Sequence, residues 1–120
     1  MPRSSADRRK AFFRGHVSEH LAALWLLLHG YSILAMRFRT KAGEIDIIAR
    51  RRDLVVFVEV KARRVVDQAV FAVDDYTARR IRNASAVWLS RQPDAARLSY
   101  RYDIIAVSPW RLPRHFPDAF

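Results

Sequence analysis

The sequence predicts an α/β fold in which a mixed central sheet is flanked by helices, with elements in the order α-β-β-β-α-β. Two runs rich in β-branched residues are typical of strands, and the short polar link 50–53 between them suits a hairpin. Apolar residues at helical spacing occur before and after these runs. A last apolar run follows the second helix, and a right-handed crossover would make it parallel to an earlier strand. We expect helices at 15–29 and 77–91 and strands at 31–38, 45–49, 54–63 and 98–107.

A single domain is expected, because 120 residues are enough for one hydrophobic core. We assign residues 14–107 to this domain. Residues 1–13 are polar and basic, so we expect a flexible arm that is either solvated or in contact with phosphates. Residues 108–120 are rich in proline and are expected to form an irregular tail, with Trp110 packed on the domain.

The first helix is expected to be deeply packed, because its sequence is apolar on nearly every face. Gly30 is positioned to end it, since glycine commonly follows the last helical turn. Glu19 lies on the first turns close to the apolar stripe, where a carboxylate is costly unless it is paired. It is either a solvated charge favoured by the helix dipole or part of a functional site. The expected buried stripe is Val17, Leu21, Leu24, Trp25 and Leu28.

The hairpin places charged residues where strands are usually apolar. A turn at the centre of the polar link would put Asp46 opposite Glu59. The same register would put Glu44 opposite Lys61. Because side chains alternate along a strand, these four residues would share one face with Ile48 and Phe57. The other face would be aliphatic and would carry Ile45, Ile47, Val56, Val58 and Val60.

A cation would resolve the repulsion between the two facing carboxylates, which otherwise destabilises a sheet. Mg²⁺ prefers oxygen ligands and takes one or two carboxylates from a protein, so Asp46 and Glu59 are candidate metal ligands. Lys61 follows on the same face, where an ammonium can orient water and stabilise charge on a phosphate. The alternative is an ordinary surface patch of salt bridges, such as Glu44 with Lys61.

The second helix is expected to begin at Thr77, which can cap its N-terminus. Its apolar spacing places Ile81, Ala84, Val87 and Trp88 in the core. Its basic face would either track a nucleic-acid backbone or serve only solubility. The residues predicted to contact nucleic acid are Arg37, Arg39, Arg63, Arg64, Arg79 and Arg80.

Composition favours a polyanionic partner, because the formal net charge is +10 and the isoelectric point is near 11.2. Only three of the 22 basic residues are lysines, which makes the position of Lys61 notable. The absence of cysteine excludes disulfides and thiolate chemistry and fits a cytoplasmic protein. The apolar run 21–28 is too short to span a membrane and no cleavage site follows it, so we expect no membrane partner.

Asp46 with Glu59-Val60-Lys61 resembles the signature of the PD-(D/E)xK nuclease superfamily, although the leading proline is missing. In the order of its motifs from residue 14 to 107, the chain resembles the small bacterial YraN-like family. That family is described as endonuclease-like and related in fold to archaeal Holliday-junction resolvases. There are three departures. The family has Gly-Glu where this chain has Ser18-Glu19, and a lysine expected early in the second helix is replaced within 77–80. Segment 65–73 is more apolar than the glycine-containing loop that the family has.

The resemblance implies a restriction-endonuclease-like fold and Mg²⁺- or Mn²⁺-dependent cleavage of phosphodiester bonds. It implies DNA as the partner, with branched DNA as the leading substrate, and a homodimer as a further partner. The implied catalytic residues are Glu19, Asp46, Glu59 and Lys61, with Asp46 and Glu59 as metal ligands and Glu44 in support. Two alternatives stay open: a nuclease-fold module that binds nucleic acid with little or no cleavage, and a scaffold that recruits a protein through residues 65–73.

Overall fold

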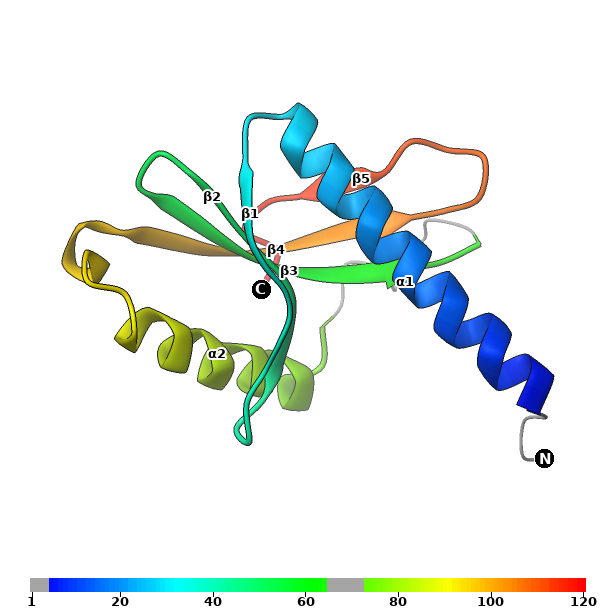
Figure 1. The fold of residues 1–120 in the computed structure, drawn as a ribbon, viewed down its shortest axis with the longest axis horizontal. Coiled ribbons are helices and arrows are strands. Elements are labelled where there is room, and N and C mark those ends of the chain that lie inside the picture. Colours follow the sequence, from blue (N-terminus) through cyan, green and yellow to red (C-terminus); the bar gives the residue numbers. More distant parts are fainter. Residues whose placement is uncertain (1–4, 65–72) are drawn as a thin grey trace.

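We describe the chain from a computed structural model, which covers residues 5–64 and 73–120, with side chains from residue 16 onward. Its five-stranded mixed sheet and two long helices confirm the predicted α/β class (Figure 1). The elements are α1 (Ser5–Leu28), β1 (Ser32–Arg39), β2 (Glu44–Arg51), β3 (Leu54–Ala62), α2 (Asp75–Ser90), the 3-10 helix η2 (Ala95–Arg97), β4 (Ser99–Val107) and β5 (Arg114–Phe116).

The strands lie in the sheet in chain order, from β1 to β5. The first three form the expected antiparallel meander, and β4 pairs parallel with β3 after the crossover through α2. The last strand, β5, pairs antiparallel with β4. The prediction of a wholly irregular tail at 108–120 is therefore wrong. A strand of three residues between two prolines carries too little periodicity to be recognised from sequence.

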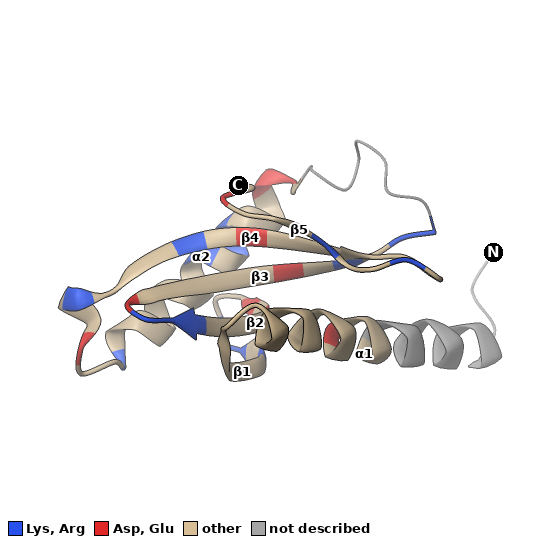
Figure 2. Cartoon of the chain, turned by 90° about the horizontal axis from the view of Figure 1, so that it is seen from above, with Lys and Arg blue, Asp and Glu red and all other residues tan. Residues whose placement is uncertain are grey.

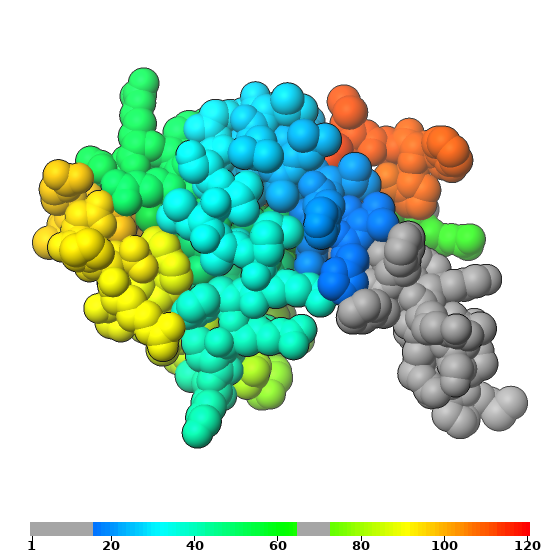
Figure 3. Space-filling model, viewed as in Figure 1, coloured from blue at the N-terminus to red at the C-terminus, as the bar shows by residue number. Residues whose placement is uncertain are grey.

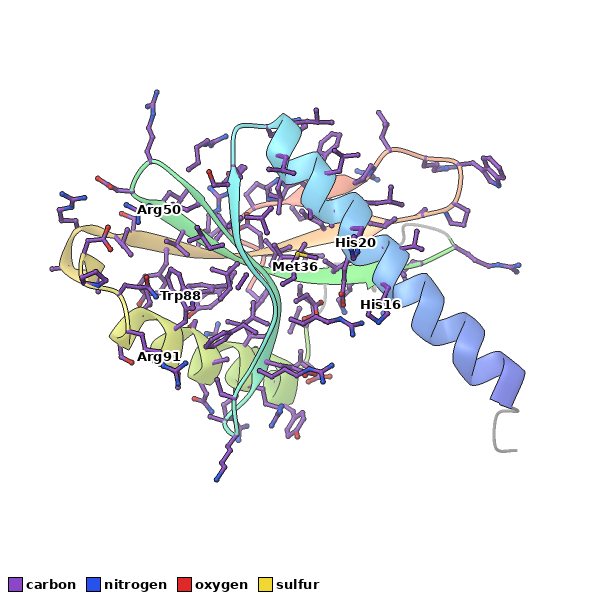
Figure 4. All side chains as sticks on the ribbon, viewed as in Figure 1. His16, His20, Met36, Arg50, Trp88 and Arg91 are labelled. Atoms are coloured by element: carbon purple, nitrogen blue, oxygen red, sulfur yellow. The ribbon has the colours of Figure 1, made fainter. Side chains whose placement is uncertain are left out.

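Each face of the sheet is covered by one helix. On the α1 side, Ile47, Val56 and Val58 pack with Ala22 and Leu26 of the helix. On the α2 side, the residues that alternate with these along β3, such as Phe57, pack around Trp88. Figure 2 shows α1 running along one side of the sheet, and Figure 4 shows Trp88 between α2 and the strands. The hydrophobic core therefore consists of two layers, one on each face of the strands.

The first helix differs from its prediction in its start and in its buried face. It begins at Ser5, so residues 5–13, which we assigned to a flexible arm, lie within the helix. Arginine, lysine and alanine there are good helix formers, which explains the longer element. The buried residues are Ser18, Ala22 and Leu26.

Most of the stripe expected to be buried in α1 is exposed instead, and Leu28 is 74% exposed. Only Trp25 of that stripe packs against the core. The helix rests on one sheet, no described element covers its outer face, and small residues at 18 and 22 allow the closest approach. The residues that are exposed contrary to prediction are Val17, Leu21, Leu24 and Leu28.

The helix ends where predicted. Gly30 adopts a φ of 87°, which favours glycine over residues with a Cβ atom. The Tyr31 amide donates to the Leu26 carbonyl and the Gly30 amide donates to the Leu27 carbonyl. This is the Schellman arrangement, and it satisfies carbonyls that the helix itself leaves without donors.

Near the middle of the β1–β2 hairpin, side chains of the same parity change from one face of the sheet to the other. Met36 and Ile47 pair and pack on the α1 side, whereas Phe38 and Ile45 pair and pack on the α2 side. Arg37 lies between these pairs and has a left-handed φ of 54°. The prediction that Ile45 shares a face with Ile47 is therefore wrong. Figure 3 shows the far end of this hairpin projecting from the body of the molecule.

The projecting end of the hairpin is in tight contact with α2. A Cβ atom added to Gly43 would lie 1.9 Å from the Arg80 carbonyl oxygen and 2.8 Å from its Cα atom. Backbone atoms cannot move aside as a flexible side chain can. Gly43→Ala is therefore expected to destabilise the protein by about 1–3 kcal/mol, as overpacking generally does. Chemical unfolding measures this, with the exposed neighbour Ala42→Ser as the control; equal stability of the two variants would contradict the contact.

The second helix begins earlier than predicted. Its N-cap is Asp74, whose Oδ1 accepts a hydrogen bond of 2.7 Å from the Thr77 amide, so Thr77 is the donor and not the cap. The core residues Ile81, Ala84 and Trp88 are confirmed, whereas Val87 is only partly buried.

Segment 65–72 lies outside the described residues, and with it most of the segment considered for recruitment of another protein. Val73 is described and packs near β4 and β5. Among the described helices, none has the length and apolar character needed to cross a membrane.

Candidate functional site

The strands β2 and β3 pair in the predicted register. Their ladder runs from Arg51 opposite Leu54 to Ile47 opposite Val58. One residue further along the two strands are Asp46 and Glu59, and the Val60 amide donates a hydrogen bond of 2.8 Å to Asp46 Oδ2. A side-chain carboxylate thus accepts from a backbone amide whose usual acceptor is a carbonyl of the neighbouring strand. The backbone ladder between β2 and β3 therefore ends at the acidic positions.

Glu59 carries the most perturbed carboxyl group of this region. The pKa of Glu59 is raised to about 8, chiefly by burial and next by the charge of Asp46, while Lys61 opposes the shift. Smaller contributions in the raising direction come from Glu44 and Glu19. A glutamate with such a pKa is mostly protonated at neutral pH, because burial penalises its charged form.

Asp46 is perturbed in the same direction. Burial raises its pKa to about 6, although the hydrogen bond from the Val60 amide lowers it. The charges of Glu19 and Glu44 add to the rise, and Arg37 counteracts them. Together with Glu59, these effects show that carboxylates from α1, β2 and β3 lie within electrostatic range of one another. Figure 2 shows the acidic positions of these three elements close together.

Glu19 reaches this region from α1. Arg37 Nε donates a hydrogen bond of 2.8 Å to Glu19 Oε2, and the two side chains are only 29% and 12% exposed. The left-handed backbone of Arg37 costs on the order of 1 kcal/mol, and this ion pair holds the residue in place. Both residues line a polar pocket of about 150 Å³ together with Arg39, Glu44 and Asp46.

The donor set is suited to a hard divalent cation. In the part of the chain that the structure describes, no three His, Cys, Asp or Glu side chains are arranged to enclose a metal ion. Mg²⁺, however, takes one or two carboxylates and keeps several waters. Asp46 and Glu59 offer only oxygen ligands, and burial together with the charges of neighbouring carboxylates raises the pKa of both. They are the residues that could hold such an ion.

Comparison with known proteins assigns the chain to a family. The model of Uncharacterised protein family UPF0102 matches residues 18–107, which span every element discussed so far except the start of α1 and β5. The chain belongs to this family. The match includes Glu19, Asp46, Glu59 and Lys61.

Relatives in the UPF0102 family cover nearly the whole chain. The UPF0102 protein R00337 of Rhizobium meliloti (strain 1021) is 64% identical over 118 residues, which are 98% of this chain and 97% of the relative. A UPF0102 protein of Sinorhizobium medicae (strain WSM419) is also 64% identical with the same coverage. The protein mlr4633 of Mesorhizobium japonicum is 58% identical over 98% of this chain and 94% of its own length.

The remaining acidic candidate of the UPF0102 chain, Glu44, lies at the mouth of the pocket. Its side chain is largely exposed, and the nearest cationic atom is Arg39 Nε at 3.6 Å. This pair replaces the salt bridge between Glu44 and Lys61 considered from the sequence. An exposed pair at this distance contributes little to stability, so Glu44 remains available for a supporting role.

The predicted nucleic-acid contacts fall into three groups. Arg37 and Arg39 lie at the acidic pocket and are engaged with its carboxylates. Arg63 and Arg64 are exposed directly after β3. On α2, Arg79 is exposed and Arg80 is partly buried, near the hairpin end and over the Tyr76 ring. Lys61, Arg63 and Arg64 are thus clustered at the end of β3.

Two residues near the site were missed or misjudged from the sequence. Asp74 interacts electrostatically with Lys61, one of several effects that lower the Asp74 pKa, the largest being the Thr77 hydrogen bond. Asp74 precedes the second helix, and an aspartate in that position is a recognised sequence signal for an N-cap. Trp110 was expected to pack on the domain and is instead fully exposed in the loop after β4. No periodicity in a loop could have predicted this.

Proposed function

We propose that this protein is a metal-dependent nuclease that hydrolyses phosphodiester bonds in DNA, with branched DNA as the leading substrate. One observation carries the proposal. Two partly buried carboxylates, Asp46 and Glu59, lie within electrostatic range of each other next to the end of the β2–β3 ladder, and Lys61 lies two residues beyond Glu59 on the same strand. A carboxylate pair with an adjacent ammonium suits phosphoryl chemistry, in which catalysis is mainly positioning and charge stabilisation.

Each residue has a distinct role in this proposal. Asp46 and Glu59 hold Mg²⁺ or Mn²⁺ through their oxygens. When bound, the cation would act as a Lewis acid on the phosphate group. Lys61 orients the attacking water and stabilises the negative charge that grows on the phosphate oxygens. Glu19, held by Arg37, completes the site through a water molecule. Water is the nucleophile, so the phosphorus–oxygen bond breaks without a covalent enzyme intermediate.

The order of elements supports the link to nucleases. The succession of α1, the β1–β3 meander, α2 and a parallel β4 agrees with the core implied by the resemblance to restriction-endonuclease-like proteins. The net charge of +10 favours a polyanionic substrate. Fold likeness alone is a weak guide to activity, so the proposal depends chiefly on the carboxylate pair.

A cleavage assay tests the proposal. Wild-type protein and Asp46→Asn are incubated with labelled four-way junction, flap, single-stranded and duplex DNA in Mg²⁺ or Mn²⁺. We expect cleavage by the wild type and a loss of at least about 100-fold in the variant, because the amide cannot replace a charged ligand. Asp53→Asn, the same chemical change at an exposed aspartate in the turn between β2 and β3, is the control and is expected to keep most activity. Equal cleavage by wild type and Asp46→Asn would contradict the proposal.

A second candidate function is nucleic-acid binding without cleavage. One observation favours it: Asp46 is engaged by the Val60 amide and Glu19 by Arg37, and no three-carboxylate cage exists among the described residues. In this case the wild type binds DNA tightly, cuts none of the substrates in either metal, and behaves like Asp46→Asn.

A further inference from the structure

A second, larger hollow lies beyond the candidate site. It is a groove of about 660 Å³ at the carboxyl ends of the parallel strands β3 and β4. One wall is apolar and comes from Val17 and Leu21 of α1. The opposite wall is the loop between β4 and β5, and Arg63 and Arg64 form the end that follows β3. In open α/β sheets, the crevice outside the carboxyl ends of strands is a common place for ligands.

The loop wall presents an unusual tryptophan. Trp110 is fully exposed, although a large aromatic ring normally gains stability by burial. Its φ is 61°, a left-handed conformation that suits glycine or asparagine at this place in a turn after Pro109. A bulky residue seldom adopts this conformation, because its Cβ atom crowds the backbone. Neither the ring nor the backbone of Trp110 is explained by packing, which points to a ligand.

The charge of the groove indicates the chemistry of that ligand. Its described lining contains three arginines, Arg63, Arg64 and Arg111, and no acidic side chain. These arginines are exposed, so their charges face an incoming molecule. Proteins that bind single-stranded nucleic acid commonly combine a basic groove, which contacts phosphates, with exposed aromatic side chains. The aromatic rings stack on bases, because every base has a face that can stack. Bases in a duplex are already stacked and offer no free face.

The groove lies directly after the candidate site along β3. Lys61 belongs to the site, and the residues that follow it, Ala62, Arg63 and Arg64, line the groove. Figure 3 shows the β4–β5 loop (orange) beside α1 (blue), at the end of the molecule away from η2 (yellow). A nucleic-acid strand that leaves Lys61 at the end of β3 would therefore meet Arg63 and Arg64 next.

We propose that this groove binds an unpaired single-stranded segment adjoining the scissile phosphodiester bond, with Trp110 stacked on a base and the three arginines contacting phosphates. The position of the bound segment next to the cleaved bond rests on the proposed function, whereas the binding of a single strand in the groove does not. It gives the substrate class as nucleic acid with a single-stranded stretch beside the cleavage position, such as a flap or the arm of a branch.

Binding without cleavage tests this proposal separately from catalysis. Fluorescence anisotropy of labelled oligonucleotides is measured in EDTA, with single-stranded DNA, single-stranded RNA and duplex DNA of equal length. Trp110→Leu is expected to weaken binding of single strands by about 5- to 100-fold, since stacking on one base contributes about 1–3 kcal/mol. Duplex binding should change less than about two-fold, and Trp110→Phe should retain most single-strand affinity.

The matched control is Tyr100→Leu, which removes a half-exposed aromatic ring at the opposite end of β4. It should leave both affinities unchanged. Equal effects of Trp110→Leu on single strands and duplex, or no effect on either, would overturn the proposal. So would a wild-type dimer that Trp110→Leu dissociates on size exclusion, because a second copy would then occupy the groove.

Intrinsic fluorescence of the wild type gives a readout that needs no variant. Trp110 is the fully exposed indole, whereas Trp88 is buried. Single-stranded oligonucleotide should therefore shield part of the emission from iodide, and duplex should not. Absence of shielding at saturating oligonucleotide overturns the proposal even if the protein cuts DNA. Shielding without any cleavage supports the groove and counts against the nuclease.

Discussion

Glu59→Gln is expected to remove cleavage and, at the same time, to stabilise the metal-free protein above neutral pH. Both effects arise from one feature, the burial of Glu59 beside Asp46, which raises the Glu59 pKa to about 8 from an ordinary value of 4.5. Glutamine keeps the shape of the side chain but carries no charge. It therefore removes the repulsion and also one of the two oxygen ligands that the proposed reaction requires.

The direction of the pH dependence follows from proton binding. Between about pH 4.5 and pH 8 the folded protein keeps a proton on Glu59 that the unfolded chain releases. The free energy of unfolding therefore falls as the pH rises through this window. Asp46 acts in the same direction between about pH 3.8 and pH 6. Since one pKa unit corresponds to about 1.4 kcal/mol, the metal-free wild type should lose a few kcal/mol on going from pH 5 to pH 8.

Urea unfolding at pH 5 and pH 8 measures this loss in EDTA and in Mg²⁺. We expect the loss to be large for the wild type in EDTA, smaller in Mg²⁺, and small for Glu59→Gln in both. A bound cation favours the ionised carboxylates of the folded state and so offsets their repulsion. Asp53→Asn, which removes a carboxylate at an exposed position, should behave like the wild type. A wild-type stability that rises from pH 5 to pH 8 without metal would contradict the assigned burial and repulsion.

The sequence predicted this carboxylate pair because hairpin register follows from the length of the link. With the ladder fixed by the turn from Arg51 to Leu54, the faces of Asp46 and Glu59 could be assigned by counting residues. The α/β class and the parallel β4 followed in the same way from periodicity and crossover geometry. What counting could not supply is the end of the backbone ladder, which depends on the Asp46 carboxylate replacing a backbone acceptor for the Val60 amide.

Predictions failed where periodicity is ambiguous or where a single backbone angle changes the geometry. The first helix is apolar all round, so its sequence gave no preference between the stripe of Leu21 and Leu28 and the buried face of Ala22 and Leu26. The face reversal in the hairpin depends on the left-handed φ of Arg37, a conformation that arginine seldom adopts. Sequence propensity predicts neither the buried face of the first helix nor the left-handed backbone of Arg37. Tertiary contacts determine both.

Asp103→Asn is expected to be the most destabilising substitution of a polar residue in the described chain. The Asp103 side chain is completely buried in β4. Arg101 donates two hydrogen bonds of 2.8 Å to its two oxygens, and His115 Nε2 and the Asp118 amide lie 2.7 Å and 2.9 Å from them. Burial would raise the pKa of Asp103, but these donors hold it below its ordinary value.

Breaking one side of such a buried charged network costs about 3–5 kcal/mol, because the remaining donors lose their acceptor. Urea unfolding at pH 7 measures the loss for Asp103→Asn. The control is Asp53→Asn, whose exposed pair with Arg50 at 3.3 Å should contribute less than about 1 kcal/mol. Because the Asp103 pKa is lowered, the stabilisation is present above its ordinary pKa of 3.8 and is lost as the pH falls below it.

The same network fixes the wall of the proposed groove. His115 belongs to β5 and Asp118 follows it, so the Asp103 carboxylate ties the returning chain to β4 on the far side of the Trp110 loop. In Asp103→Asn, amide hydrogen exchange should therefore rise first in β5 and only later in the β2–β3 hairpin. Single-strand affinity should decline with it, while the pH dependence contributed by Glu59 persists. Uniform exchange across all strands would show instead that β5 is not an independent unit and that Asp103 supports the whole sheet.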